Sequence, residues 1–119
     1  MWFVLLLASG LRAADLPLTV AEPAGVERRG EIVTGGVCLP RGAHRADASF
    51  RLLDGDREVP LQTSPLVVDR DGSLRWLLLD FPIDLAAHAR KTLVLRAGPS
   101  TARPAHSIEI RETAEFIRI

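Results

Sequence analysis

The hydrophobic residues of the chain fall into short runs at intervals of roughly ten residues, separated by Gly, Pro and Asp. This pattern is typical of β-strands joined by turns, because helical spacing over ten or more residues is missing. The predicted strands are Leu16–Val20, Glu31–Thr34, Val37–Leu39, Ala48–Leu53, Glu58–Thr63, Leu66–Val68, Leu74–Phe81, Lys91–Arg96, Ser107–Arg111 and Ala114–Ile119. The sequence therefore predicts an all-β fold, a small Greek-key barrel or a sandwich.

Glycines and aspartates mark the predicted turns between these strands. Asp54-Gly55-Asp56 lies between two apolar runs and predicts a hairpin, because glycine adopts positive φ at little cost. Asp69 to Ser73 predicts a second turn, in which Ser73 has a role in turn structure. The pair Gly35-Gly36 favours a bulge or a bend within its strand. The segment Asp84–His88 is too short for a stable helix and is predicted to be a loop.

The most apolar predicted strand after the N-terminal run is Leu74–Phe81. Strict alternation places Leu74, Trp76 and Leu78 on one face, and Leu77, Leu79 and Phe81 on the other. Both faces are apolar, so we expect a central strand with Trp76 inside the barrel. Cys38, in an apolar stretch, is expected to be a small buried residue.

Residues 1–14 resemble a secretory signal peptide. Trp2–Leu7 is an apolar run too short to span a membrane, and the small residues Ala13 and Ala14 follow it. No basic residue precedes the run, so a buried N-terminal strand is the alternative. Export to a secreted or periplasmic location agrees with the lone cysteine, which has no internal partner for a disulfide.

The remaining chain divides into a barrel over residues 15–97, an extended linker over 98–105 and a last segment over 106–119. The last segment holds either final strands or the start of a following domain. Because it ends on an apolar strand, we expect the chain to be a fragment of a longer protein.

Composition excludes several classes of function. Fifteen basic and fifteen acidic residues give a net charge of zero, which is unlike a nucleic-acid-binding domain. Aromatic residues make up 5% of the chain and tyrosine is missing, which disfavours a stacking surface for sugars or bases. A single cysteine forms neither a disulfide framework nor a zinc site. We expect no cofactor, no nucleic acid partner and no membrane span.

The candidate catalytic groups do not form a recognisable constellation. His44, His88 and His106 are far apart in the sequence and lack ligands at metal spacing. Asp69 and Asp71 flank one turn, where we expect solvated acids rather than a catalytic pair. We therefore predict no catalytic, cofactor-binding or metal-binding residue in this chain.

Three stretches together resemble the N-terminal barrel domain of exo-rhamnogalacturonan lyase-like proteins. They are a strand and turn at Val33–Gly42, a hairpin at Leu53–Gln62 and the strand Asp71–Phe81, which begins Asp-Gly-Ser-x-Arg-Trp. Cys38 departs from the pattern, since the family usually has proline there. The residues that carry the resemblance are Gly35, Gly42, Asp54, Gly55, Asp71, Gly72, Ser73, Arg75 and Trp76.

The resemblance implies a six-stranded Greek-key (RIFT-type) barrel that precedes a helical catalytic domain in secreted polysaccharide lyases. It gives the matched residues structural roles: Trp76 fills the barrel, and Arg75 points outward or pairs with an acid at the barrel end. The predicted function is a non-catalytic accessory barrel whose partner is the following catalytic domain, with polysaccharide as a further candidate partner. The alternatives are a stand-alone secreted module that binds a glycan or a protein, and a decayed gene product without a stable fold.

Overall fold

A computed structural model of the chain describes residues 15–106, 108–112 and 117–118. The predicted signal peptide and most of the predicted strand 114–119 lie outside the described residues. The strands are β1 Leu16–Ala21, β2 Arg28–Cys38, β3 Phe50–Asp54, β4 Arg57–Val59, β5 Gln62–Val68, β6 Leu74–Leu85, β7 Arg90–Ala97, β8 Arg111–Glu112 and β9 Ile117–Arg118. The described part of the chain contains no helix, which confirms the prediction of an all-β fold.

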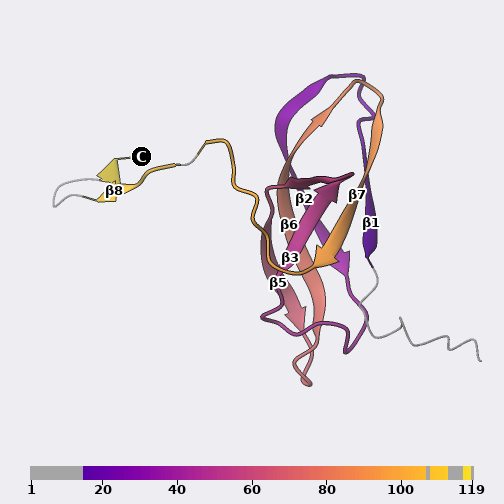
Figure 1. Ribbon diagram of the computed structural model, residues 1–119, viewed down its shortest axis with the longest axis vertical. Helices are drawn as coiled ribbons and strands as arrows, with labels where there is room; N and C mark the ends of the chain where they lie inside the picture. Colours follow the sequence, from indigo (N-terminus) through magenta and orange to yellow (C-terminus); the bar gives the residue numbers. More distant parts are fainter. Residues whose placement is uncertain (1–14, 107, 113–116, 119) are drawn as a thin grey trace, which may run out of the picture.

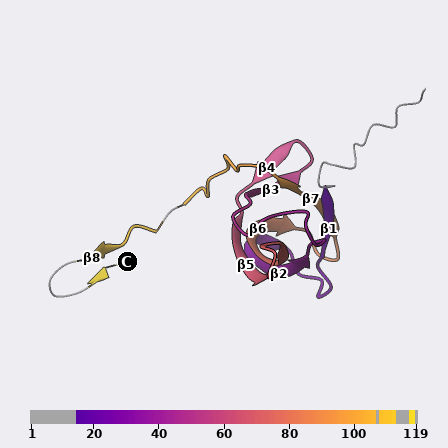
Figure 2. The ribbon, with the colours of Figure 1, turned by 90° about the horizontal axis from the view of Figure 1, so that it is seen from below.

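Two antiparallel sheets form the main body of the structure (Figure 1). One has four strands in the order β1-β7-β3-β4, and the other has three in the order β2-β6-β5. Seen from the end, the two sheets curve around a common interior (Figure 2). No ladder joins the two sheets within the described residues, so these seven strands do not close into one continuous sheet. β8 and β9 form a separate short ladder.

The core lies between the two sheets and consists mostly of leucine. Leu52, Leu93 and Leu95 come from the four-stranded sheet, and Leu77 and Leu79 come from the three-stranded sheet. Each of these side chains is at most 2% exposed. They follow the period-two alternation of their strands, because successive residues of a strand point to opposite sides of the sheet.

Proline decides where the chain changes sheets after β4. The sequence predicts one strand over Glu58–Thr63, but β4 ends at Val59 and β5 begins at Gln62. Pro60 lies at this crossing, where its missing N–H costs no ladder hydrogen bond. Pro65 lies inside β5, which is an edge strand and therefore tolerates it.

Two further predictions of local structure are wrong. β2 pairs with β6 in regular register from Glu31 to Cys38, so Gly35-Gly36 is not a bulge. The irregularity of β2 lies instead between Arg28 and Glu31. β6 continues to Leu85, beyond the predicted end at Phe81, because the lengthened β2 provides backbone partners for it.

Candidate functional site: the outer face of the three-stranded sheet

Trp76 lies on the outer face of the three-stranded sheet, and 44% of its surface is exposed. The prediction that it fills the barrel is wrong, and a β-bulge is the reason. Leu74 and Trp76 pair with the consecutive residues Val68 and Val67 of β5, so β6 has one extra residue here. The extra residue resets the alternation. Leu74 and Leu77 therefore both point into the core, whereas Trp76 points outward.

The residues around Trp76 form an apolar surface on neighbouring strands. Cys38 of β2 and Val67 of β5 are the register partners of Trp76. A Cβ atom added to Gly36 would meet the Trp76 ring at 3.6 Å and Leu66 Cδ1 at 3.8 Å. We call this surface the Trp76 face, and its members are Ile32, Gly36, Cys38, Leu66, Val67, Trp76 and Leu78.

Cys38 is exposed on this face, which corrects the prediction that it is buried. Its apolar sequence neighbours suggested burial. However, the register of β2 places Cys38 beside Trp76, on the side of the sheet that points away from the core. The chain therefore carries its one thiol on this outer surface, at the end of the edge strand β2 and beside Trp76.

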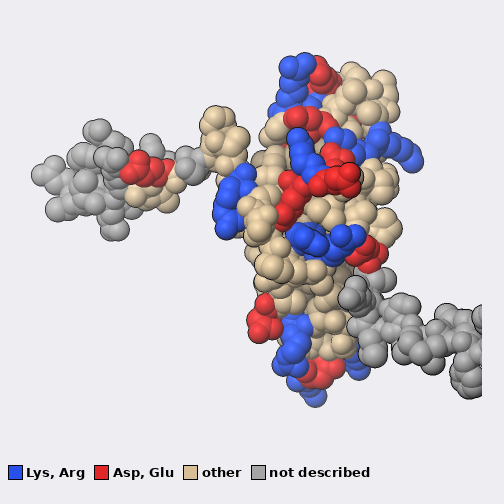
Figure 3. Space-filling view, in the orientation of Figure 1, with Lys and Arg blue, Asp and Glu red and all other residues tan. Residues whose placement is uncertain are grey.

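Exposed large hydrophobic side chains gather in the three-stranded sheet. Ile32, Leu66, Val67, Val68 and Trp76 all belong to β2, β5 or β6, and none of the described exposed ones belongs to β1, β3, β4 or β7. Ion pairs occur beside both sheets, such as Arg96–Asp15 at 2.7 Å next to the four-stranded sheet and Arg28–Glu31 at 3.1 Å within β2. Acidic and basic side chains are interspersed on the face visible in Figure 3. The two sheets thus differ in the large apolar side chains that they expose.

A polar row crosses the Trp76 face and separates Ile32 from the rest of it. Thr34, Asp80 and Gln62 are register partners on β2, β6 and β5. The Thr34 hydroxyl donates a hydrogen bond to the Asp80 carboxylate. This row provides hydrogen-bonding groups between two apolar areas.

At one end of the face, Asp69 and Arg75 form an ion pair. The Asp69 carboxylate accepts hydrogen bonds from Arg75 Nη1 and from Arg41 Nε, each at 3.0 Å. Arg75 Nε also donates to the backbone oxygen of Leu39 at 3.1 Å. Arg75 thus adopts one of the two predicted arrangements, in which it pairs with an acid at the barrel end. Asp69 is occupied by two guanidinium groups and is not available as a base.

The turn at Asp71-Gly72-Ser73 is held by its own side chains. Asp71 Oδ1 accepts a hydrogen bond from the backbone N–H of Ser73 at 2.8 Å, and this bond holds the pKa of Asp71 below its usual value. The Ser73 side chain is buried, and its Oγ accepts a hydrogen bond from the Gly42 N–H at 2.9 Å. Ser73 therefore joins two loops at this end of the barrel, and it lacks the setting of a nucleophile.

The other residues singled out in the sequence also have structural contacts. Asp54 and Gly55 form the predicted hairpin, in which Asp54 pairs with Arg57 and Gly55 has a φ of 60°. The His44 ring contacts Phe50 edge-on at a centroid distance of 5.0 Å, and burial lowers the pKa of His44. Gly35 has no atom within 4 Å of an added Cβ.

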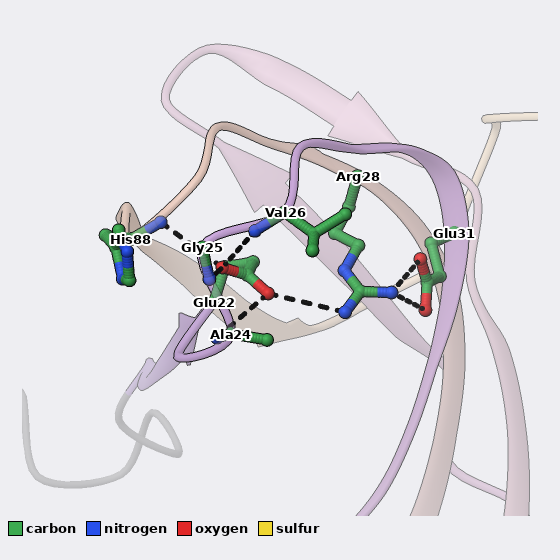
Figure 4. Close-up of polar contacts among 7 residues, drawn as sticks. All are labelled: Glu22, Ala24, Gly25, Val26, Arg28, Glu31 and His88. Atoms are coloured by element: carbon green, nitrogen blue, oxygen red, sulfur yellow. Dashed lines mark hydrogen bonds and ion pairs between the residues drawn. The ribbon is translucent and has the colours of Figure 1, made fainter.

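A buried carboxylate that sequence reasoning missed closes the opposite end of the barrel (Figure 4). Only 2% of the Glu22 side chain is exposed. Its oxygens accept hydrogen bonds from the backbone N–H groups of Ala24, Gly25, Val26 and His88, and from Arg28 Nη2. The loops β1–β2 and β6–β7 both cross between the sheets here, and this Glu22 clasp holds them together. The acid directly before Pro23-Ala24-Gly25 was the available signal.

The hydrogen bonds decide the charge of Glu22. Burial by itself would raise the pKa of this carboxyl, but four backbone N–H groups, led by that of His88, outweigh burial and lower the pKa to about 2. Arg28 adds an ion pair at 3.3 Å and also binds Glu31. Glu22 is therefore a charged structural anchor at neutral pH.

A family model, the PcRGLX-like N-terminal RIFT barrel domain, matches residues 22–96. The chain belongs to this family. The match covers well over half of the sequence and confirms the resemblance found in the three sequence motifs. No curated protein and no solved structure matches the chain. The family description implies that this RIFT barrel is the N-terminal domain of a larger protein.

The contacts at the two ends of the RIFT barrel stabilise its loops. Most of the large apolar side chains that the two sheets leave exposed lie on the Trp76 face. Within residues 15–106, 108–112 and 117–118, no group of three or more His, Cys, Asp or Glu side chains is placed to hold a metal ion. In the same residues, no helix has the length and apolarity needed to cross a bilayer. The candidate functional site considered for this RIFT barrel is the Trp76 face.

Proposed function

We propose that this chain is a non-catalytic N-terminal accessory barrel of a secreted polysaccharide lyase-like protein that degrades rhamnogalacturonan. The observation that carries the proposal is the family match, which makes the barrel the first domain of a larger protein. The apolar run at Trp2–Leu7 supports export, since it resembles the hydrophobic part of a signal peptide.

The proposal assigns the chemistry to the domains that follow. Cleavage of a uronic acid polysaccharide by β-elimination needs a base for the C5 proton and a group that neutralises the carboxylate. In the barrel, Asp69 is held by Arg41 and Arg75, and Ser73 is held by Gly42. These groups maintain the fold, and such structural roles are expected for the polar residues of an accessory domain.

The exposed indole of Trp76 favours a second candidate, a stand-alone module that binds a glycan or a protein. An exposed aromatic ring on a sheet can stack on a sugar ring. However, its neighbours Leu66 and Val67 have aliphatic side chains that offer no hydrogen bond to sugar hydroxyl groups, and the Cys38 thiol offers only a weak one. Trp76 is also the one aromatic side chain among the exposed large hydrophobics of the described residues. A protein surface is thus the better match for the Trp76 face.

Three experiments test the proposed function. The DNA downstream of the Ile119 codon is expected to continue in frame into a large helical domain. The 119-residue chain is expected to release no unsaturated uronide from pectin fragments, as followed by ultraviolet absorbance. Release of the unsaturated product by the purified barrel would contradict the assignment. A cooperative thermal unfolding transition, followed by circular dichroism, excludes a decayed chain without a stable fold.

A further inference from the structure

We propose that the Trp76 face is the surface on which the domain after the linker docks in the larger protein. This inference rests on the proposed accessory function and names the partner of the barrel and the side of the barrel that it contacts.

The composition of the Trp76 face is that of an interface core. Ile32, Leu66 and Trp76 are 60%, 53% and 44% exposed, although such side chains are usually buried in a single domain. The ion pair of Asp69 with Arg75 borders the larger apolar area at one end, and the polar row of Thr34, Asp80 and Gln62 borders it at the other end and separates it from Ile32. An apolar area bordered by hydrogen-bonding groups is characteristic of surfaces that bind another folded protein domain.

The path of the chain after β7 leads toward the three-stranded sheet. Thr101 is bound twice to Glu58 of β4: its N–H donates to Oε1 at 3.0 Å and its hydroxyl donates to Oε2 at 2.9 Å. These bonds hold the linker on the side of the barrel where β4 and β5 lie, and from there the chain runs away from the barrel (Figure 1). The exit point of the linker is therefore set by side-chain contacts.

After Thr101, the linker lies beside the outer face of the three-stranded sheet. Ala102–Pro104 lines a groove of about 510 Å³ together with Ile32, Gln62 and Pro82. Ile32 belongs both to this groove and to the Trp76 face, so the linker passes the part of the face that the polar row separates from Trp76. Arg103 in this segment donates to the backbone oxygen of Ala102.

The short linker limits how far the following residues can lie from this face. Ile108 comes four residues after Pro104, and four residues span at most about 14 Å. Ile108 and Ile110 are 77% and 67% exposed, so apolar side chains follow directly after the linker. Pro99 and Pro104 stiffen the linker and restrict the directions that the following chain can take. A domain that begins here is thus tethered within a short distance of the Ile32 end of the Trp76 face.

Cys38 is the probe for the test, because it is the single cysteine of the chain and lies on the Trp76 face. The rate at which a maleimide modifies Cys38 is measured by peptide mass spectrometry in the 119-residue chain and in the longer protein encoded by the continuing frame. Docking is expected to slow the reaction at least tenfold in the longer protein. The double variant Leu66→Ser/Trp76→Ser of the longer protein is expected to restore the fast rate.

Val26→Ser is the matched control, because Val26 is 50% exposed but lies in the β1–β2 loop, away from the Trp76 face. It is expected to leave Cys38 protected. Equal Cys38 rates in the two proteins would overturn the docking proposal and leave the accessory function standing. A reading frame that ends without encoding a further domain would overturn both the docking proposal and the accessory function. If Cys38 of the 119-residue chain becomes protected as the protein concentration rises, the Trp76 face binds a second copy of the chain. If Cys38 becomes protected only when rhamnogalacturonan fragments are added, the face binds a glycan. Either result would overturn the docking proposal.

Discussion

The indole of Trp76 lies against Gly36 of the neighbouring strand, where a Cβ atom would stand 3.6 Å from ring atom Cε3 and 3.8 Å from Cζ3. The same Cβ would stand 3.8 Å from Leu66 Cδ1. A larger residue at position 36 would therefore meet both side chains. Glycine here leaves room for Trp76 to lie on the sheet, and the position links β2, β5 and β6 across the Trp76 face.

The effect of a substitution at Gly36 is expected to depend on the size of the new side chain. Gly36→Ala places a methyl group at ordinary contact distance and removes the entropic cost of a strand glycine, so we expect stability to rise by about 0.5–1 kcal/mol. Gly36→Ile adds branches that displace the indole, which is expected to shift Trp76 fluorescence. The measurement is urea unfolding together with emission spectra in a Trp2→Phe background. Gly35→Ile, at a position without neighbours within 4 Å, is expected to leave the emission unchanged.

Trp76→Ala is expected to leave the protein folded. Trp76 is 44% exposed, and the apolar area that the folded protein buries on it is worth about 2–3 kcal/mol, part of which an alanine retains. Leu77 is 2% exposed, and Leu77→Ala is expected to cost about 2–5 kcal/mol because it leaves a cavity in the core. The two variants are compared by urea unfolding. A cost for Trp76→Ala as large as that for Leu77→Ala would show that the indole is part of the core.

The Glu22 clasp is expected to make the barrel sensitive to acid. The pKa of Glu22 is lowered from 4.5 to about 2 in the folded state, so folding favours the charged form. The stabilisation is fully present above the unfolded pKa and is lost as the pH falls from 4.5 to about 2. Thermal unfolding at a series of pH values is expected to show a falling Tm across this window.

Glu22→Gln tests the origin of that pH dependence. The variant keeps an oxygen acceptor but loses the charge, so we expect Tm to fall by several degrees at pH 7 and to depend less on pH below 4.5. Glu31→Gln is the matched control, because Glu31 also binds Arg28 but its side chain is 51% exposed. The clasp is disproved as the source if both variants keep the same acid-induced loss of Tm as the natural chain.

Gly72→Ala is expected to destabilise the Asp71-Gly72-Ser73 turn. The φ of Gly72 is 84°, which costs a residue with a side chain about 1–3 kcal/mol, and the added Cβ would stand 2.7 Å from Arg45 Nη2. Arg45 can move, so the backbone conformation is expected to dominate the loss. Gly35→Ala, at a position with neither positive φ nor near neighbours, is the control and is expected not to destabilise. Chemical unfolding of both variants measures the difference.

Local features of the fold were predictable because they depend on neighbouring residues. The hairpin at Asp54-Gly55 and the turn at Asp71-Gly72-Ser73 follow from the conformations that glycine permits and from the short hydrogen bonds of aspartate. The break between β4 and β5 could also have been expected at Pro60. These features need no knowledge of the partner strands.

The candidate site was not predictable in this way. The position of Trp76 depends on a bulge of β6 against β5, and the exposure of Cys38 depends on the register of β2 against β6. Glu22 binds the backbone N–H of His88, which is 66 residues away in the chain. Apolarity in the sequence indicates that a residue avoids water, but it does not say whether the core or another domain covers it.

The sequence by itself determined the all-β class, the main turns and the family, because period-two patterns, turn residues and motif spacing are local properties of the chain. Only the tertiary structure decided that Trp76 and Cys38 face outward, that a buried Glu22 joins two loops, and that the linker leaves beside the Trp76 face. The physical reason is that a shift of one residue in strand register moves a side chain from one face of a sheet to the other. Register is set by pairing between strands that are distant in the sequence.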